Sequence, residues 1–433
     1  MSRIPAKAIL WTGVLYLMLV FAFLAALTLV NKIPNERILK HVRGSFSHEN
    51  YRYSLTGITK MDHFTECIVL TMGLSDSASN MGSLTRSLLS PTVGQCDRTR
   101  EALLRSEKHG FNYWRFWHGY QIVSRPVLYF TDAHGLRLIC FLIFSLSYLL
   151  MFQSIRTNIN FSFSMISALT LLVAPLYSQL YSIHYSLVWA LGFSLAAFLL
   201  YSARQVGEIF KRYYLWMFGV VGMLTAYFDL LTNPLVTLTI PLLVLYWKDD
   251  WPGKKQSRPA WMTVLMIVTA WSAGYFSCWG AKWILASFVL EQSVVLEIGR
   301  KIACRLGSEY CPDEDIPVTA LNSILRNLYY WKIGIFAVLS LAAVAALKTV
   351  HRAKGLVHGR RQFGNTMTFL IIFLLPFAWL ALARNHSTIH AWFVAPILYP
   401  SFALLIGELW RTIRSHPTYN KKKDIAPGAG THG

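Results

Sequence analysis

The chain has 433 residues, of which 54% are hydrophobic and only 14% are charged. Ordinary soluble domains carry about 25% charged residues, so this composition excludes a soluble globular protein and indicates a polytopic helical membrane protein. The net charge of +20 does not indicate nucleic-acid binding, because the Lys and Arg residues lie in short segments between apolar runs. A nucleic-acid-binding protein would gather them on a soluble basic domain.

Apolar runs recur along the chain, each long enough to cross a hydrocarbon core of about 30 Å. They predict an all-α polytopic membrane fold with about ten transmembrane helices. The first run is long and has no convincing small-residue cleavage site, so we interpret it as an anchor rather than a signal peptide. The predicted spans cover residues 8–30, 136–151, 161–180, 185–200, 213–230, 235–247, 260–290, 330–347, 366–383 and 391–409.

The basic residues of the short connections assign the orientation of these spans. With a cytoplasmic amino terminus, the basic segments all fall on the cytoplasmic side, as the positive-inside rule requires. We predict a single transmembrane domain over 1–411 and a disordered basic cytoplasmic tail over 412–433. The opposite side carries a first external loop at about 31–129 and a second at about 291–329.

The first external loop contains two segments, 85–89 and 96–106, that mix Arg and Leu at helical spacing and resemble interfacial helices. Two of the six cysteines, Cys140 and Cys278, fall inside apolar runs and are expected to be free core thiols. The other four lie in the two loops. If these loops face an oxidising compartment, the simplest disulfide pairing is Cys67–Cys96 with Cys304–Cys311, and the two other pairings remain open.

Two acidic residues of the first external loop stand directly before an apolar segment that begins at Cys67. Asp62 and Glu66 are four residues apart, so on a helix their side chains share one face. A carboxylate near a reacting hydroxyl is a candidate general base, and acids beside an apolar helix are costly unless they are used. The alternative is that they only stabilise a helix amino terminus, where acids are favoured.

An aromatic and basic cluster follows later in the same loop. Arg115, His118 and Arg125 carry donors suited to a phosphate, and the rings beside them suit a sugar or an isoprenoid. The alternative is an aromatic belt at the membrane interface, which accounts for Trp114 and Trp117 without any substrate.

Two further polar clusters fall on the external side. Asp229 ends one apolar run and Asn233 precedes the next, where a turn favours both residue types, although an acid at the end of a span is also a candidate site residue. Asn385, His386 and His390 offer donors for a phosphate or a sugar. The two histidines have the spacing of a helical metal pair, but no acid or cysteine lies nearby in the sequence, so zinc is not expected.

The layout of a first span, a long external loop with acids near its start, interfacial helices and many later spans resembles the GT-C superfamily of membrane glycosyltransferases. Four short blocks also look like those of a poorly characterised group of bacterial GT-C-like proteins. These blocks are 62–66, 116–120 with Arg125, 228–229, and 385–387 with His390.

The resemblance implies an inverting glycosyltransferase in the bacterial cytoplasmic (inner) membrane, with its active site on the extracytoplasmic face. The donor would be a polyprenyl-phosphate-linked sugar and the acceptor an envelope glycan or a lipid. Asp62 would be the general base and Glu66 its partner, and a divalent cation (Mg or Mn), if one is used, would bind to these two acids. The implied substrate-binding residues are His63, Arg115, His118, Tyr120, Arg125, Asp229, Asn233, Asn385, His386 and His390.

Two other functions remain open at this point. A lipid-linked sugar transporter or flippase predicts charged residues distributed through the middle of the spans. A non-catalytic membrane factor for envelope glycan assembly predicts that loss of the external acids is tolerated.

Overall fold

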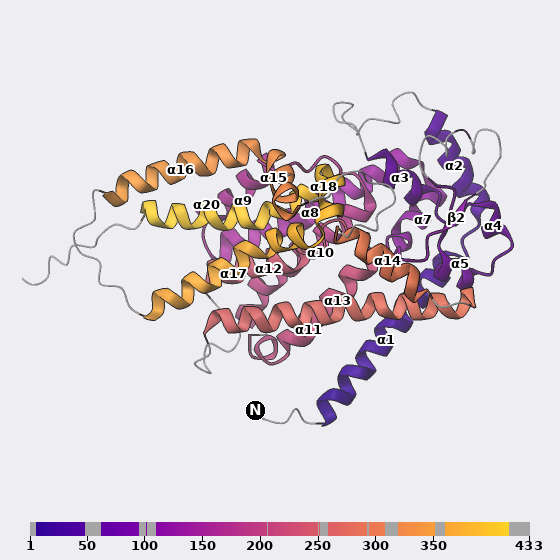
Figure 1. The fold of residues 1–433 in the computed structure, drawn as a ribbon, viewed down its shortest axis with the longest axis horizontal. Coiled ribbons are helices and arrows are strands. Elements are labelled where there is room, and N and C mark those ends of the chain that lie inside the picture. The colour runs from indigo at the N-terminus through magenta and orange to yellow at the C-terminus, as the bar shows by residue number, and fades with distance from the viewer. Residues whose placement is uncertain are drawn as a thin grey trace, which may run out of the picture.

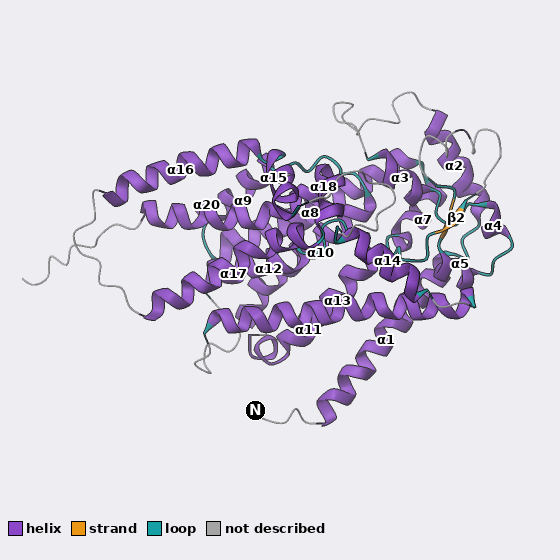
Figure 2. Ribbon diagram, viewed as in Figure 1, coloured by secondary structure: helices purple, strands orange, loops and turns teal. Residues whose placement is uncertain are grey.

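The computed structural model describes residues 6–47, 62–94, 101, 110–205, 207–249, 251, 259–291, 294–307, 319–350 and 360–414. Within these ranges the fold is almost entirely helical. The described strands form one short antiparallel pair, β1 (Pro91–Thr92) with β2 (Phe111–Asn112). The long helices lie roughly side by side, and short helices of the first loop gather at one end of them (Figures 1 and 2).

The long, apolar elements form the body of the molecule (Figure 1). Five described helical segments are long and apolar enough to cross a membrane, namely Leu10–Val30, Ala133–Asn158, Ile183–Tyr201, Ala260–Leu290 and Ala391–Arg414. The other predicted spans fall on shorter apolar helices, so the multi-pass character is supported while the count of ten stays a prediction. The body consists of α1 (Ala6–Val30), α8 (Ala133–Asn158), α9 (Phe161–Val173), α10 (Ile183–Gln205), α11 (Gly207–Phe228), α12 (Val236–Lys248), α13 (Ala260–Leu290), α16 (Lys332–Val350), α17 (Arg360–Leu382) and α20 (Tyr399–Arg414).

Short helices make up the described parts of the two long loops and the connection before α20. Residues 174–180, predicted to continue the third span, instead belong to a non-helical connection over 174–182 between α9 and α10. The short elements are α2 (Asn35–Ser47), α3 (His63–Leu70), α4 (Asp76–Ser79), α5 (Ser83–Leu89), α7 (Gln121–Phe130), α14 (Val295–Arg305), α15 (Ala320–Tyr329), α18 (Arg384–Ile389), α19 (Ala391–Val394) and the 3₁₀ helix η3 (Ala395–Leu398).

Polar residues at the helix starts explain where several helices begin. Asp62, Asp132 and Asn160 each accept a hydrogen bond from the backbone N–H three residues later, at the starts of α3, α8 and α9. Such a cap satisfies one of the amide groups that has no partner within the helix. The helix predicted at 85–89 is present as α5, but its last three residues are buried against α1 and α13 rather than spread on an interface.

Small residues allow a close approach between α11 and α13. A Cβ atom added at Gly222 would lie 2.1 Å from the carbonyl oxygen of Trp271, and one added at Gly274 would lie 2.0 Å from that of Gly219. Glycine at these positions lets the two helix backbones touch, as small residues do in membrane helix pairs.

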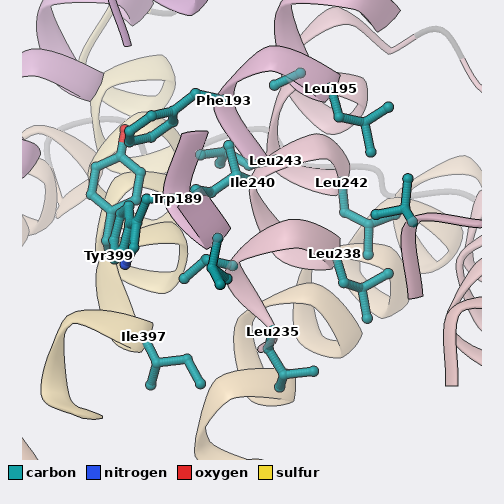
Figure 3. Packing of buried hydrophobic residues seen from close by; sticks show 14 of the residues in the cluster. Trp189, Phe193, Leu195, Leu235, Leu238, Ile240, Leu242, Leu243, Ile397 and Tyr399 are labelled. Carbon is teal, nitrogen blue, oxygen red and sulfur yellow. The ribbon is translucent and has the colours of Figure 1, made fainter. Parts of the chain in front are cut away.

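The apolar core lies between α10, α12 and the segment that leads into α20. Trp189 and Phe193 of α10 lie close to Ile240 of α12 and to Tyr399 (Figure 3). Trp189 and Tyr399 are both fully buried, with ring centroids 5.8 Å apart. This packing holds the carboxyl-terminal segment against the start of α10, which carries part of the candidate site.

Candidate functional site

Asp62 caps α3 and is almost completely buried, with 1% of its surface exposed. Its Oδ1 accepts a hydrogen bond of 3.2 Å from the backbone N–H of Thr65, and its Oδ2 accepts one of 2.7 Å from the hydroxyl of Tyr185. Burial raises the pKa of the Asp62 carboxyl above its usual range, and the hydrogen bonds from Tyr185 and Thr65 act in the opposite direction. The capping role and a chemical role are therefore compatible, because the cap uses only one carboxylate oxygen.

Glu66 lies one turn further along α3 and has a different environment. Arg137 of α8 binds its carboxylate with two hydrogen bonds, from Nε to Oε1 at 2.8 Å and from Nη2 to Oε2 at 2.7 Å. Both side chains are buried. A divalent cation on Glu66 would have to displace this guanidinium, so the acid pair does not fit a metal ion. Among the described residues there is also no group of three or more His, Cys, Asp and Glu side chains placed to hold one.

Tyr185 connects Asp62 to the histidine cluster near the carboxyl terminus. Its ring lies 5.4 Å from that of Phe393, centroid to centroid. Phe393 in turn lies 4.9 Å from His390 and 6.0 Å from His386. Residues from the first long loop and from the segment before α20 are therefore linked through Tyr185.

Asp229 joins the same region through the turn between α11 and α12. It is fully buried, and its carboxylate accepts hydrogen bonds from the backbone N–H and the hydroxyl of Thr232 and from the backbone N–H of Asn233. Burial raises the pKa of Asp229 to about 6, against these hydrogen bonds. Asn233 donates from Nδ2 to the carbonyl oxygen of Phe393 at 2.8 Å, so both predicted residues shape the turn and hold it against α19.

His118 is buried in a tight turn with a φ of 57°. Its Nε2 bonds to the carbonyl oxygen of Tyr113 at 2.8 Å and its Nδ1 to the hydroxyl of Tyr120 at 2.9 Å. A carbonyl only accepts, so Nε2 carries the proton and Nδ1 accepts from Tyr120. Burial lowers the pKa of His118 to about 3, so the imidazole is neutral and both of its nitrogens are occupied.

Gly119 attaches this turn to the end of α11. Its N–H donates to the carbonyl oxygen of Tyr227 at 2.8 Å, and a Cβ atom at this position would lie 2.4 Å from the Tyr227 ring. Trp117 is fully buried and donates from Nε1 to the carbonyl oxygen of Cys278 at 2.8 Å. The interfacial-belt interpretation is therefore wrong for Trp117, because packing within the protein accounts for it.

The two arginines predicted to clamp a phosphate do not lie together on one ligand site. Arg125 is buried and donates to the backbone carbonyls of Val30, Ile33 and Met72 and to Oδ1 of Asn35, which ties α7 to the end of α1. Arg115 is partly exposed and forms a 3.0 Å ion pair with Glu297 of α14. The guanidinium of Arg125 is thus used to hold the fold together, whereas Arg115 links the two long loops.

The remaining predicted residues lie around α18. Asn385 donates from Nδ2 to the carbonyl oxygen of Cys304 at 2.9 Å, and His386 bonds through Nε2 to the carbonyl oxygen of Leu231 at 2.7 Å. The imidazoles of His386 and His390 lie 4.8 Å apart. His63 is the first residue of α3, and its side chain lies outside the described part of the structure.

Cys67 of α3 and Cys304 of α14 each take part in a disulfide bond. Cys96 and Cys311 lie outside the described residues, so the pairing stays a prediction. Cys140 and Cys278 are free and buried, which confirms the expectation for the two cysteines in apolar runs.

Two buried cations were not identified from the sequence. Arg137 pairs with Glu66, and Lys282 of α13 donates from Nζ to the carbonyl oxygens of Ser87 and Leu88 at 2.9 and 2.8 Å. Lys282 thereby caps the carboxyl end of α5, where a positive charge is favoured. Both residues stand inside predicted apolar runs. A charged residue at such a position is costly unless it is paired, so it could have been singled out from the sequence.

An apolar groove of about 400 Å³ lies between α1, α11 and α13, with Tyr16, Met223 and Ser277 among its lining residues. Ser277 precedes Cys278, whose carbonyl oxygen accepts a hydrogen bond from Trp117 Nε1. Comparisons with protein-family models, with curated proteins and with solved structures give no match to this chain.

Proposed function

We propose that this protein is a membrane glycosyltransferase that transfers a sugar from a polyprenyl-phosphate-linked donor to an envelope glycan or lipid acceptor. The reaction would take place on the extracytoplasmic face of a bacterial cytoplasmic membrane. The observation that carries this proposal is the environment of Asp62, a buried carboxylate with a raised pKa that Tyr185 ties to the other polar clusters.

Asp62 is the proposed general base. The acceptor hydroxyl oxygen attacks the anomeric carbon and its proton passes to an Asp62 carboxylate oxygen, while the bond from that carbon to the donor phosphate oxygen breaks. A base with a raised pKa holds the proton more readily at neutral pH. Each carboxylate oxygen has two lone-pair positions, so the bonds from Thr65 and Tyr185 leave acceptor capacity for a substrate hydroxyl.

The supporting residues have different proposed roles. Glu66 is held by Arg137 and thereby fixes the orientation of α3 and of Asp62. We propose no step that uses a metal ion. His386 and His390 face the leaving phosphate, whereas His118, Tyr120, Arg125, Asp229 and Asn233 shape the site through the contacts described above. The apolar groove beside α1 is of a size to take part of the lipid tail.

The decisive test is transfer by purified protein supplied with polyprenyl-phosphate sugars. Asp62→Asn keeps a capping oxygen but cannot take a proton, so transfer should fall by about 10²- to 10⁴-fold. Asp132→Asn is the matched control, because Asp132 caps α8 in the same way but does not lie beside Tyr185. Equal loss in both variants would mean that Asp62 acts only as a cap.

One observation favours a second candidate, a non-catalytic membrane factor for envelope glycan assembly. Asp62 has 1% of its surface exposed, and both of its carboxylate oxygens already accept hydrogen bonds. This candidate predicts normal complementation of a deletion strain by Asp62→Asn and no transfer by the wild-type protein with any donor.

A further inference from the structure

The first turn of α18 is fixed to the last turn of α14. Asn385 donates to the carbonyl oxygen of Cys304 at 2.9 Å, and Arg384 donates from Nη2 to that of Gly307 at 3.0 Å. Arg305 lies between these two anchor points in the sequence, and its positive charge acts on both His386 and His390. A cation of the second external loop is thereby brought to the histidine pair.

The two histidines present nitrogens that the protein itself does not use. His386 donates from Nε2 to the carbonyl oxygen of Leu231, so its Nδ1 is the nitrogen without a proton. This Nδ1 is buried and has no hydrogen-bond partner. His390 is half-buried, and its ring stacks on Phe393 with centroids 4.9 Å apart. A buried polar atom without a partner is costly, which makes His386 a group that a ligand would satisfy.

The charge around these imidazoles favours an anion. Burial, and after it the charge of Arg305, lowers the pKa of His390 to about 4 and the pKa of His386 well below its usual range. An anion bound beside Arg305 would offset that positive charge and allow the imidazoles to take protons. Guanidinium and imidazolium groups are both strong donors to phosphate oxygens.

We propose that Arg305, His386 and His390 form a phosphate-binding subsite, in which the guanidinium and the two imidazoles donate to the oxygens of a phosphate ester. This proposal rests on the proposed function in one respect, namely that the phosphate belongs to the lipid-linked donor. The ring contacts from His386 through Phe393 to Tyr185 connect this subsite with the hydrogen-bond partner of Asp62. A free phosphate has the same chemistry, so the test must separate the two sources.

Calorimetric titration of the full-length protein in detergent measures binding without requiring transfer. The probes are farnesyl phosphate and inorganic phosphate. Arg305→Gln removes the charge, Arg305→Lys keeps it, and His390→Gln keeps a polar side chain of similar size. The matched control is Arg300→Gln, because Arg300 is an exposed arginine on the same helix.

We expect wild type and Arg300→Gln to bind with the same Kd, whereas Arg305→Gln and His390→Gln bind at least about tenfold more weakly, a difference of about 1.4 kcal/mol. Arg305→Lys should lie between them, because lysine keeps the charge but loses the forked geometry. A thermal melt of each variant checks that weaker binding does not come from unfolding.

Tighter binding of farnesyl phosphate than of inorganic phosphate supports the subsite with the lipid-linked donor as its ligand, and equal affinities support it with free phosphate. The subsite is overturned if wild type binds neither probe, if Arg305→Gln binds as wild type does, or if Arg300→Gln weakens binding equally. Asp62→Asn should keep phosphate affinity. Intact binding with no transfer by wild type would therefore overturn the proposed function while leaving the subsite standing.

Discussion

The hydroxyl group of Tyr185 donates a 2.7 Å hydrogen bond to Oδ2 of Asp62, although the two residues are 123 positions apart. Both side chains are buried. The bond joins the start of α10 to the start of α3 and fixes the carboxylate on which the proposed transfer depends. Because Tyr185 also packs against Phe393, one side chain connects the proposed base with the proposed phosphate subsite.

Tyr185→Phe should shift the pH dependence of transfer. The tyrosine hydrogen bond stabilises the ionised carboxylate, so its loss raises the pKa of Asp62 further. A general base acts in its ionised form, and activity should therefore decline at a higher pH in the variant than in wild type as the solution is acidified. The pH profile of kcat/KM measures this shift.

Tyr181→Phe is the control for that experiment. The Tyr181 ring stacks on Phe141, whereas the hydrogen bond to Asp62 comes from Tyr185. A shift of equal size in both variants, or no shift in Tyr185→Phe, would contradict the assigned role of the bond.

Asp229 should make the protein less stable as the pH rises. Its pKa is about 6 in the folded protein, against an ordinary value of 3.8, so the folded state keeps a proton that the unfolded chain releases. The stability from this proton is fully present below the unfolded pKa and is lost as the pH rises through about 6, by up to about 3 kcal/mol.

Thermal melts of wild type and Asp229→Asn between about pH 4 and about pH 8 test this linkage. Asparagine does not titrate, so the difference in Tm should move in favour of the variant as the pH rises. A difference that stays constant over the range would show that Asp229 titrates normally.

The buried pair of Glu66 and Arg137 should respond asymmetrically to mutation. Glu66→Gln or Arg137→Met alone leaves an uncompensated buried charge and should cost about 3–5 kcal/mol of stability. The double variant removes both charges and should recover most of that loss. A double-mutant cycle in chemical or thermal denaturation measures the coupling, and strictly additive losses would argue against a stabilising pair.

Gly119→Ala should destabilise the turn that carries His118. The new Cβ atom would lie 2.4 Å from the Tyr227 ring and 2.6 Å from the Tyr227 carbonyl oxygen, so the hydrogen bond between the two backbones must break or shift. We expect a loss of about 1–3 kcal/mol, as for other overpacked sites. Gly280→Ala is the control, because its Cβ would meet no atom within 4 Å, and it should be neutral or slightly stabilising.

The cysteines allow a chemical test of the predicted pairing. Cys67 and Cys304 each take part in a disulfide bond, and Cys140 and Cys278 are free. The simplest pairing therefore predicts two reactive thiols in denatured, non-reduced protein. Digestion should release disulfide-linked peptides that contain Cys67 with Cys96 and Cys304 with Cys311. A linked peptide that contains Cys67 and Cys311 would contradict this pairing. Reduction should cost about 2–5 kcal/mol of stability.

Local sequence patterns predicted much of this molecule. Each predicted apolar run falls on an apolar helix. The agreement follows because a helix that crosses a membrane needs a continuous apolar stretch, and such a stretch is visible in the sequence. The boundary near Val173 was wrong because the next residues, although apolar enough to extend the run, form a connection instead. The alternative that Asp62 stabilises a helix start was confirmed, because Asp62 caps α3; its role as a base stays a prediction.

The roles of the charged residues could not be predicted from local sequence patterns. Arg125 looked like a phosphate ligand, yet its donors are used by carbonyls of Val30, Ile33 and Met72. Glu66 was predicted to act as the partner of Asp62, yet its carboxylate is bound by Arg137, 71 positions away. Composition and spacing identify which groups are available, but they do not identify the partner of each.

The sequence by itself determined that the chain is a helical membrane protein, where its apolar helices lie and which polar clusters stand between them. These are local properties, set by hydrophobic length and helix capping. Only the tertiary structure decided that Asp62 meets Tyr185 while Glu66 meets Arg137, and that the charge of Arg305 acts on the histidine pair. Contacts over such separations depend on how the helices pack, and packing is a property of all their surfaces together.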